Sequence, residues 1–381
     1  MEAMTHHVEE RVFLKGDDYF SQLLVDIASA QHTIFFEAYI FEADALGEKI
    51  ADALSQAARR GVKVQVLVDG VGSPHWGNAL TQQLESHGVE TRVFHPFPWQ
   101  LAHWQRMQMK VSFLFRMGYL FAQINSRNHR KTCLIDEQIV YVGSANIHHH
   151  HLSLAQGGAG WRDTVVRLVG VPVDDLIFAQ MTAWNHVSIP EHLYKLFGRP
   201  NVNAVIRLNY SRHRRRIFYK NLLRRLAKCR HRVWITNAYF VPDNRLLKNL
   251  RDLAQTGVDV RIILPHKSDI LMMPWASAIF YQSLLKAGVR IFEYTPAMLH
   301  AKSLIIDHWF LVGSSNLNHR SLLHDLEVDA SLKSRQAKQM LMEQFLHDMK
   351  NSVEITLESW NRRPWYQKWL GHVLLYLKYW I

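Results

Sequence analysis

The sequence predicts an α/β fold of two similar lobes, each a mixed β-sheet flanked by helices, related by a pseudo-twofold axis with one site at their interface. The chain of 381 residues exceeds the ~100–200 residues of an ordinary domain and can bury two cores. Its two halves repeat one order of strand and helix patterns, and in each half these patterns lead to the same histidine motif. We therefore expect lobes over residues 1–195 and 196–350, joined near residues 188–203, and a C-terminal tail over 351–381.

Each predicted element of the first half has a counterpart in the second. Apolar, aromatic runs at residues 34–41 (IFFEAYIF) and 233–240 (VWITNAYF) are typical of buried strands. The elements that follow occur in the same order in both halves: helices at 46–60 and 245–256 that end at Gly61 and Gly257, strands at 62–68 and 258–264, and, after a further helix, strands at 89–94 and 289–292. Such alternation predicts sheets covered by helices.

The repeated motif combines histidine, lysine, aspartate, serine and asparagine at fixed spacing. The two copies are His129-x-Lys131-x4-Asp136 with Gly143-Ser144-x-Asn146, and His300-x-Lys302-x4-Asp307 with Gly313-Ser314-x-Asn316. A single copy could arise by chance, but two copies at nearly equal spacing indicate one site that holds a phosphate from two sides.

Strand periodicity divides the residues of each motif between two faces. Side chains on a strand alternate with period two, so His129 and Lys131 are expected on one face, as are His300 and Lys302. The motif aspartates lie seven positions beyond their histidines, which places them on the other face. We therefore interpret Asp136 as a structural or second-shell group of the catalytic motif, and the same interpretation applies to its counterpart Asp307.

The chemistry of these side chains fits a phosphoryl group. Lysine is a cationic donor, and four neutral side chains are expected to donate hydrogen bonds to phosphate oxygens: Ser144, Asn146, Ser314 and Asn316. An imidazole with a pKa of about 6.5 is free to attack at neutral pH, while its partner can carry a proton. One histidine can thus act as nucleophile and the other as acid.

The paired motifs resemble the phospholipase D superfamily, and the chain is most similar to the bacterial cardiolipin synthases of the shorter B type. Further phrases appear in the family's order at residues 67–73 (LVDGVGS), 237–240 (NAYF) and 312–317 (VGSSNL). The resemblance implies phosphatidyl transfer through a phosphohistidine, in which two phosphatidylglycerol molecules give cardiolipin and glycerol, with no cofactor and no metal. The first motif departs from the family, because it reads Gly-Ser-Ala-Asn where paired glycines are commoner.

The resemblance also suggests roles for single residues. It implies that His129 is the nucleophile and His300 the general acid, although the symmetry of the two motifs leaves the order open. Asp163 and Glu327 resemble the family's acids that orient the histidines, with an ordinary salt bridge as the alternative for each. A run of histidines at residues 148–151 could bind a metal, but consecutive residues converge poorly on one ion, so we expect no metal site.

Two aromatic segments indicate contact with a membrane. The first half carries an insertion at about residues 95–128, rich in aromatic, methionine and basic side chains, that leads into the first histidine. Residues 365–381 (WYQKWLGHVLLYLKYWI) are apolar and aromatic but shorter than the ~20 residues of a span, which favours a helix lying in the interface. For both segments the alternative is a helix packed on its lobe.

Charge and cysteine content define the expected partners and compartment. Lys and Arg total 45 against 33 Asp and Glu, a net charge of +12, and basic residues concentrate at 207–228, either as a surface for anions or as a solvated helix face. We expect an anionic glycerophospholipid substrate, a membrane surface and no nucleic acid. No secretory leader is recognisable near residue 1, and Cys133 and Cys229 suit a reducing compartment. We therefore expect a peripheral protein on the cytoplasmic face of the bacterial inner membrane.

Three other functions are alternatives to phosphatidyl transfer. Water as acceptor would make the protein a phospholipase D, and a nucleic-acid phosphodiester as substrate would make it a nuclease. A nuclease is expected to line a groove with basic and stacking aromatic side chains, whereas this chain gathers its aromatic residues into apolar clusters. A non-catalytic lipid-binding scaffold would not require intact histidines and lysines in both motifs.

Overall fold

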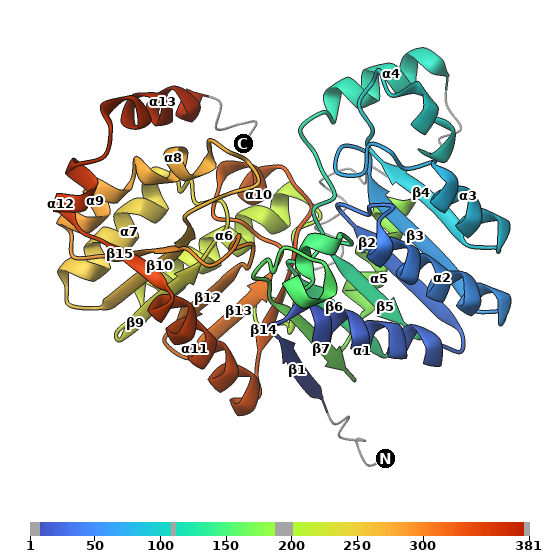
Figure 1. Cartoon of the computed structure of the whole chain (residues 1–381), viewed down its shortest axis with the longest axis horizontal. Helices are drawn as coiled ribbons and strands as arrows, with labels where there is room; N and C mark the ends of the chain where they lie inside the picture. The colour runs from blue at the N-terminus through green and yellow to red at the C-terminus, as the bar shows by residue number, and fades with distance from the viewer. Residues whose placement is uncertain (1–7, 108–111, 187–200, 377–381) are drawn as a thin grey trace.

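The computed structural model describes residues 8–107, 112–186 and 201–376, which form two α/β halves lying side by side (Figure 1). The regular elements of the first half are β1 (Glu9–Phe13), α1 (Gly16–Ser29), β2 (Thr33–Ala38), α2 (Ala45–Arg59), β3 (Lys63–Asp69), α3 (Ala79–Ser86), β4 (Glu90–Phe94), α4 (Phe113–Ala122), β5 (Thr132–Ile135), β6 (Ile139–Gly143), β7 (Val165–Val169) and α5 (Asp174–Trp184). Short 3-10 helices lie at Leu101–His103, Gln105–Met107, His149–His151 (η3) and Leu154–Gln156.

The second half repeats this order and adds a strand and two helices at its end. Its elements are β8 (Ile206–Leu208), α6 (Arg212–Ala227), β9 (Arg232–Thr236), α7 (Asn244–Gln255), β10 (Asp259–Pro265), α8 (Met273–Ala278), α9 (Tyr281–Lys286), β11 (Arg290–Tyr294), β12 (Ser303–Ile306), β13 (Trp309–Gly313), α10 (His319–Leu323), β14 (Val328–Leu332), α11 (Arg335–Lys350), β15 (Ser352–Ile355), α12 (Leu357–Asn361) and α13 (Trp365–Tyr376).

The two sheets share one topology. The first runs β1-β7-β6-β5-β2-β3-β4 and the second β15-β11-β10-β9-β12-β13-β14-β8. Strands β2, β3 and β4 are parallel, as are β9, β10 and β11, while the remaining pairings in each sheet are antiparallel. The prediction of two mixed sheets flanked by helices is therefore confirmed.

One hydrophobic core joins the halves. It contains Val142 and Val166 of β6 and β7 together with Val312 and Val328 of β13 and β14, all fully buried. Separate cores lie under the helices of each half. Because the strands that follow the two histidine motifs border the shared core, the motifs are brought to the junction between the halves.

The predicted ends of the first helices are confirmed. Gly61 follows α2 with φ of 91°, and Gly257 follows α7 with φ of 88°, a left-handed conformation that costs glycine little. The two halves differ in the helices before their fourth strands: the second half has two short helices, α8 and α9, where the first has α3. The expected join near residues 188–203 lies mostly outside the described residues. The tail expected from residue 351 begins with β15, which pairs with β11 and completes the second sheet.

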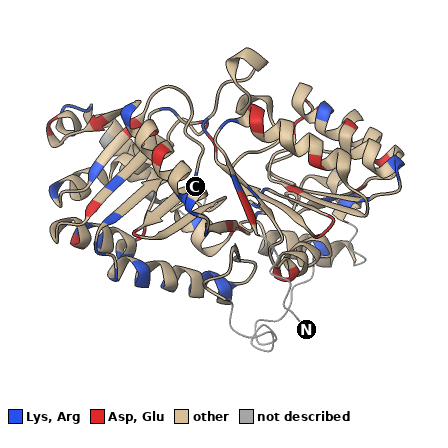
Figure 2. Cartoon of the chain, turned by 90° about the horizontal axis from the view of Figure 1, so that it is seen from below, with Lys and Arg blue, Asp and Glu red and all other residues tan. Residues whose placement is uncertain are grey.

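Most of the basic run at residues 207–228 lies on α6, and Figure 2 shows the Lys and Arg of this helix at the lower edge of the second half. Part of this charge supports the structure. The Arg214 guanidinium donates two hydrogen bonds of 3.0 Å to Asp175, and Arg207 is buried between the rings of Phe218 and Trp309. The run is thus neither wholly a solvated face nor wholly a surface for anions.

The two aromatic segments lie on the same side of the molecule, α4 above the first half and α13 above the second (Figure 1). Each packs one face and exposes the other. In α13, Leu374 is buried in a cluster with Tyr239 and Met298, whereas Trp365 and Trp369 are exposed. Helix α4 buries Leu120 against Trp104 and leaves a run of exposed side chains: Phe113, Leu114, Phe115 and Phe121. Among the described helices, none has the length and apolarity that crossing a bilayer requires.

Candidate active site

The two histidine segments cross from one half to the other. Asn128 forms a parallel bridge with Leu326, and Arg162 forms one with Leu299. The backbone N–H of His129 donates to the carbonyl of Leu326 at 3.0 Å, and that of His300 donates to the carbonyl of Arg162 at 2.9 Å. The histidines therefore precede strands β5 and β12 rather than lying within them, in contrast to the expectation of one continuous strand.

The histidine of each motif is bonded to a carboxylate from the opposite half. Nδ1 of His129 lies 3.0 Å from both carboxylate oxygens of Glu327, and Nδ1 of His300 lies 2.8 Å from Oδ1 of Asp163. All four side chains are buried. Because a carboxylate accepts the Nδ1 proton, Nε2 of each neutral ring is left with its lone pair. The two acids that resembled orienting groups in the sequence thus have the contacts such a role requires.

The motif lysines lie beside the histidines in both halves. Nζ of Lys131 donates to the carbonyl of His129 at 2.9 Å, and Nζ of Lys302 donates to that of His300 at 2.6 Å. Tyrosines cover them: Nζ of Lys131 is 5.1 Å from the Tyr39 ring centre, and Nζ of Lys302 is 5.8 Å from that of Tyr239.

Electrostatic coupling places both motifs in one site. Lys302 lowers the pKa of both His129 and His300, in addition to the larger effect of burial. Burial, and then the charge of Lys302, lower the pKa of Lys131 to about 7, while burial lowers that of Lys302 to about 8. The two lysines thus crowd positive charge into the site, and a phosphate anion would relieve their repulsion.

The serines of the motifs have a different role from the one we expected. Oγ of Ser144 donates to Oδ1 of Asp163 at 2.7 Å, and Oγ of Ser314 donates to Oε2 of Glu327 at 2.5 Å. A hydroxyl has a single hydrogen, so neither serine has one left for a phosphate oxygen. The geometry corrects the prediction: both serines hold the acids that orient the histidines.

The motif asparagines are buried at the same site. Oδ1 of Asn146 accepts a hydrogen bond from the backbone of Ile40 at 3.3 Å, which directs its amide nitrogen elsewhere. Oδ1 of Asn316 has no hydrogen-bond partner within the described part of the chain. Asn316 also lines a cavity of about 70 Å³ together with Lys302 and Glu327. Both amides stay available for a bound group.

Two further side chains, which the sequence analysis missed, distinguish the halves. His151 follows Asn146 by five positions, and its Nδ1 lies 2.5 Å from Oδ2 of Asp163. Ser321 follows Asn316 by the same interval, and its Oγ donates to Oε1 of Glu327 at 2.6 Å. The equal spacing after each asparagine is the signal that could have revealed them.

The exchange of His151 for Ser321 accompanies opposite pKa shifts of the two acids. Burial raises the pKa of Glu327 to about 7, against the opposing effect of Lys131. Burial would also raise the pKa of Asp163, but His151 and His300 outweigh it and leave it well below its usual range. Asp163 is therefore a firm carboxylate between two imidazoles, whereas Glu327 exchanges its proton near neutral pH.

The motif aspartates lie at the far ends of strands β5 and β12 and hold turns. The carboxylate of Asp136 accepts backbone N–H groups of residues 31–33 at 2.7–2.8 Å, and that of Asp307 accepts those of residues 230–232 at 2.9 Å. Both aspartates are left-handed, with φ of 50° and 49°. These contacts agree with the structural role expected from strand parity, so we class both aspartates with the fold and not with the groups that act on the phosphate.

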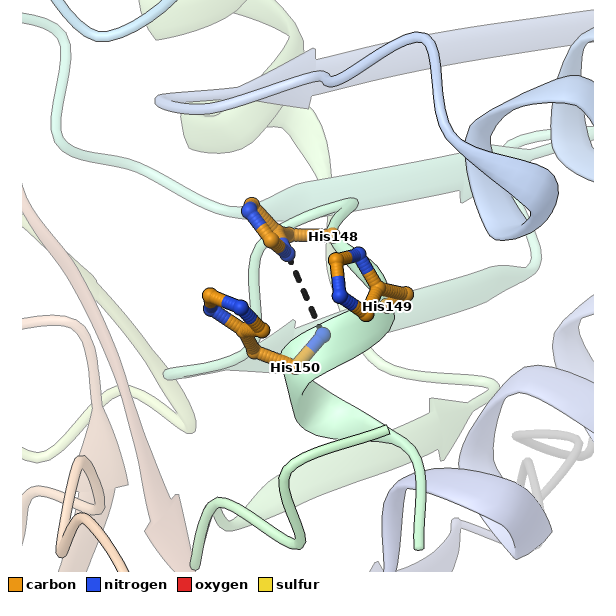
Figure 3. Close-up of side chains that lie close together, drawn as sticks. All are labelled: His148, His149 and His150. Atoms are coloured by element: carbon orange, nitrogen blue, oxygen red, sulfur yellow. Dashed lines mark hydrogen bonds between the residues drawn. The ribbon is translucent and has the colours of Figure 1, made fainter. Parts of the chain in front are cut away.

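The histidine run also differs from expectation. The rings of His148, His149 and His150 gather on one side of η3 (Figure 3), and each offers a nitrogen within 4.8 Å of the others. Nδ1 of His149 lies 2.8 Å from a carboxylate oxygen of Asp44. The prediction that consecutive histidines fail to converge was wrong, because the chain passes from extended backbone at His148 into a 3-10 turn.

Comparison with known proteins agrees with this geometry. Residues 23–156 and 222–349 match the family described as cardiolipin synthase, PLD-like domain. The cardiolipin synthase of Halalkalibacterium halodurans is 30% identical over 94% of this chain and 69% of its own length. The major cardiolipin synthase of Bacillus subtilis is 30% identical over 93% of this chain and 71% of its own.

Solved structures share the fold at low sequence identity. The phosphatidylserine synthase of Haemophilus influenzae superposes with a TM-score of 0.66 at 14% identity, over 97% of this chain and 93% of that one. The polyphosphate kinase of Porphyromonas gingivalis has a TM-score of 0.60 at 13% identity, over 97% of this chain and 53% of that one. With both halves matched and its relatives aligned over nearly its whole length, the chain belongs to the cardiolipin synthase family of phospholipase D-like proteins.

Proposed function

We propose that this protein is a phosphatidyltransferase of the cardiolipin synthase type, which joins two phosphatidylglycerol molecules into cardiolipin and releases glycerol. The observation that carries the proposal is the pair of histidine–carboxylate contacts formed across the junction of the halves. Two imidazoles held at one site suit a double displacement at phosphorus, in which one ring attacks and the other transfers protons.

The reaction has two steps. Nε2 of His129 attacks the phosphorus of the first lipid, a nitrogen–phosphorus bond forms, and the bond from phosphorus to the glycerol oxygen breaks. His300 gives its Nε2 proton to that oxygen. In the second step His300 takes the proton of a hydroxyl on the second lipid, whose oxygen attacks phosphorus and releases His129.

The unequal acids support this order of roles. His129 suits the role of a neutral nucleophile. Burial and the two lysines hold its pKa well below the usual range, and the pKa of its partner Glu327 lies near 7. A proton carrier fits His300, because the ionised Asp163 stabilises an imidazolium. Burial and Lys302 lower the pKa of His300 to about 3, so this ring gains its proton when the negative charge of a bound lipid offsets the charge of Lys302.

The remaining polar groups hold the phosphate. Lys131 and Lys302 supply positive charge from both halves, and the amide nitrogens of Asn146 and Asn316 supply neutral donors. Ser144 and Ser314 act through the acids that they position. No step of this scheme needs a cofactor, because the lysines and the protonated imidazole meet the developing charge.

We further propose that the protein binds peripherally to the cytoplasmic face of the inner membrane, with α4 and α13 in the interface. Aromatic side chains exposed above both halves suit the boundary between headgroups and acyl chains. The buried face of α13 shares a cluster with Tyr239, which covers Lys302, so this helix lies close to the catalytic site. We propose residues 1–195 as the first lobe and extend the second lobe from 196–350 to residue 355, because β15 completes its sheet.

Labelled phosphatidylglycerol in vesicles tests the activity. We expect cardiolipin and free glycerol from the native chain, and no product from His129→Ala. Phosphatidic acid as the main product would identify a phospholipase D instead, and no turnover would favour a lipid-binding scaffold. Trapping the intermediate by acid-free quenching and peptide mapping tests the order of roles. Label on the peptide that contains His300 would reverse the assignment.

A further inference from the structure

We propose that His148, His149 and His150 bind one divalent transition-metal ion of the Zn²⁺ class at the edge of the active site. The three residues are consecutive, and their rings stand together on one side of η3 (Figure 3). Nothing in the phosphatidyl transfer described above uses them. They therefore form a second cluster with a chemistry of its own.

The distances are close to those that one ion requires. Ring centres are separated by 4.6 Å between His148 and His149, 4.0 Å between His148 and His150, and 4.4 Å between His149 and His150. The ligand nitrogens all lie within 4.8 Å of one another. Tetrahedral Zn²⁺ with bonds of 2.0–2.1 Å spaces its nitrogen ligands by ~3.3 Å, so small rotations of the rings suffice.

A carboxylate orients one of the three rings. Oδ2 of Asp44 lies 2.8 Å from Nδ1 of His149 and also accepts that residue's backbone N–H at 2.7 Å. This contact places the ring proton on Nδ1 and leaves Nε2 of His149 free for an ion. Histidine ligands of zinc are commonly held by a carboxylate in this way, which fixes the ring and increases its basicity.

The other two rings are accessible and lightly restrained. Nδ1 of His148 accepts the backbone N–H of His150 at 3.1 Å (Figure 3), a single hydrogen bond that a metal–nitrogen bond would replace. The side chain of His148 is 23% exposed and that of His150 is half-buried, so an ion can enter from solvent and keep a water ligand. Three imidazoles select Zn²⁺, Co²⁺, Ni²⁺ or Cu²⁺ over Mg²⁺ and Ca²⁺, which prefer oxygen ligands.

The corresponding loop of the second half lacks this set. Counting from each motif asparagine, Asn318, His319 and Arg320 occupy the positions of the three histidines. One imidazole beside a permanent cation is no ligand set for a metal ion. The proposed site is therefore a feature of the first half alone.

The cluster adjoins residues of the reaction centre. The next residue along the chain, His151, is bonded to Asp163. The ring of Trp161 lies 5.3 Å from that of His150 and 5.6 Å from that of His300. A bound ion would stabilise the loop that carries His151, so occupancy of this site and the activity of the enzyme are expected to be linked.

Cobalt binding to the chelator-treated, tag-free full chain tests the site. Co²⁺ held by three imidazoles and water gives strong visible absorption, whereas hydrated Co²⁺ absorbs weakly. We expect one equivalent of Co²⁺ to produce the band and one equivalent of Zn²⁺ to abolish it by competition. His148→Ala, His149→Ala and His150→Ala should each weaken the affinity by at least ~100-fold.

Two further variants make the test specific. Asp44→Asn keeps an acceptor at the N-cap of α2 and should weaken metal binding about 10-fold. His319→Ala, in the matching loop of the second half, should leave it unchanged. A native chain without the absorption band, or equal binding after all three histidines are replaced, would overturn the proposal. Circular dichroism of each variant distinguishes a lost site from a lost fold, and none of these measurements depends on the lipid substrate.

Discussion

Nδ1 of His129 lies 3.0 Å from the carboxylate of Glu327, although the two residues belong to opposite halves of the chain. The hydrogen bond fixes which nitrogen of the ring carries the proton and thereby presents Nε2 to phosphorus. Ser314 and Ser321 hold the same carboxylate in place. The proposed nucleophile is thus bonded to a group that reaches it only when the two halves are packed together.

Replacing Glu327 by Gln should lower kcat by about 10²- to 10⁴-fold, because the amide no longer accepts the Nδ1 proton with a full charge. Asp329→Asn is a matched control, since this half-buried carboxyl two positions further along the chain bonds Ser315 and not a histidine. Initial rates of cardiolipin formation measure both variants. Full activity of Glu327→Gln would remove this residue from the mechanism.

The value of kcat/KM should fall as the pH rises above about 7 to 8. Burial lowers the pKa of Lys131 to about 7 and that of Lys302 to about 8. Each lysine is mostly protonated, and therefore charged, only below its pKa. Deprotonation therefore weakens attraction for an anionic lipid in the free enzyme, whereas bound phosphate keeps the lysines protonated and leaves kcat less affected.

Lys131→Arg is the corresponding variant for this pH dependence. Arginine stays protonated throughout the range, so the decline of kcat/KM with pH should move to higher pH even if the overall rate is lower. Profiles of kcat/KM and kcat for both proteins over pH 6–10 provide the measurement. Identical alkaline declines in the two proteins would assign the titration to another group.

His151→Ser introduces the residue found at the matching position of the second half. We expect kcat to fall about 10-fold or more with little change in KM, because Asp163 loses one of its two imidazole partners and stabilises protonated His300 less well. A lipid with a nitrophenol leaving group needs no proton for its departure. The deficit should shrink with that substrate, and a deficit of equal size with both substrates would indicate a purely structural role.

Asp136→Ala should destabilise the fold rather than stop the reaction. The carboxylate accepts three backbone N–H groups at the start of β2, so its loss should lower the free energy of unfolding by about 1–2 kcal/mol. Asp136→Asn tolerates the left-handed backbone and keeps an acceptor, and it should recover most of this loss. Urea unfolding and initial rates test both variants. Lost activity at unchanged stability would return Asp136 to the catalytic group.

Joint replacement of Trp365 and Trp369 by Ala should weaken binding to phosphatidylglycerol vesicles by about 10-fold and raise KM for vesicle substrate. Short-chain soluble lipid should react at the native rate, because neither side chain belongs to the catalytic site. Leu154→Ala, which changes an exposed side chain outside α4 and α13, serves as control. Unchanged vesicle binding of the double variant would argue against α13 as an interfacial helix.

The features that the sequence predicted are those that follow from periodic patterns and repeats. Alternation of apolar strands and amphipathic helices, with Gly61 and Gly257 as helix ends, was sufficient for two mixed sheets, and the repeated motifs were sufficient for a shared site. The contacts of Ser144 and Ser314 were not predictable in this way, because local spacing does not show that Asp163 and Glu327 compete with a phosphate for the same hydroxyl hydrogens.

Other errors have equally local causes. The histidines were expected inside continuous strands, but the backbone of each donates a hydrogen bond to the other half beside an isolated bridge, which no pattern within one half encodes. The convergence of His148, His149 and His150 depends on a turn of backbone that a run of identical residues does not reveal. The contact of His151 with Asp163 was not predictable from the run at residues 148–151, because the run itself does not distinguish a ring that faces the acid from three that face one another.

The exchange of carboxylates between the halves has a consequence for how such a chain could arise. If two identical copies of one half assembled about a true twofold axis, the two histidine–carboxylate pairs would have to be identical. The side chains bonded to the two carboxylates would then be identical as well. Joining the copies in a single polypeptide removes that obligation. Here one acid is Asp163, bonded to His151, and the other is Glu327, bonded to Ser321. After duplication and fusion of an ancestral half, the two histidines could in this way evolve separate roles, one in attack and the other in proton transfer.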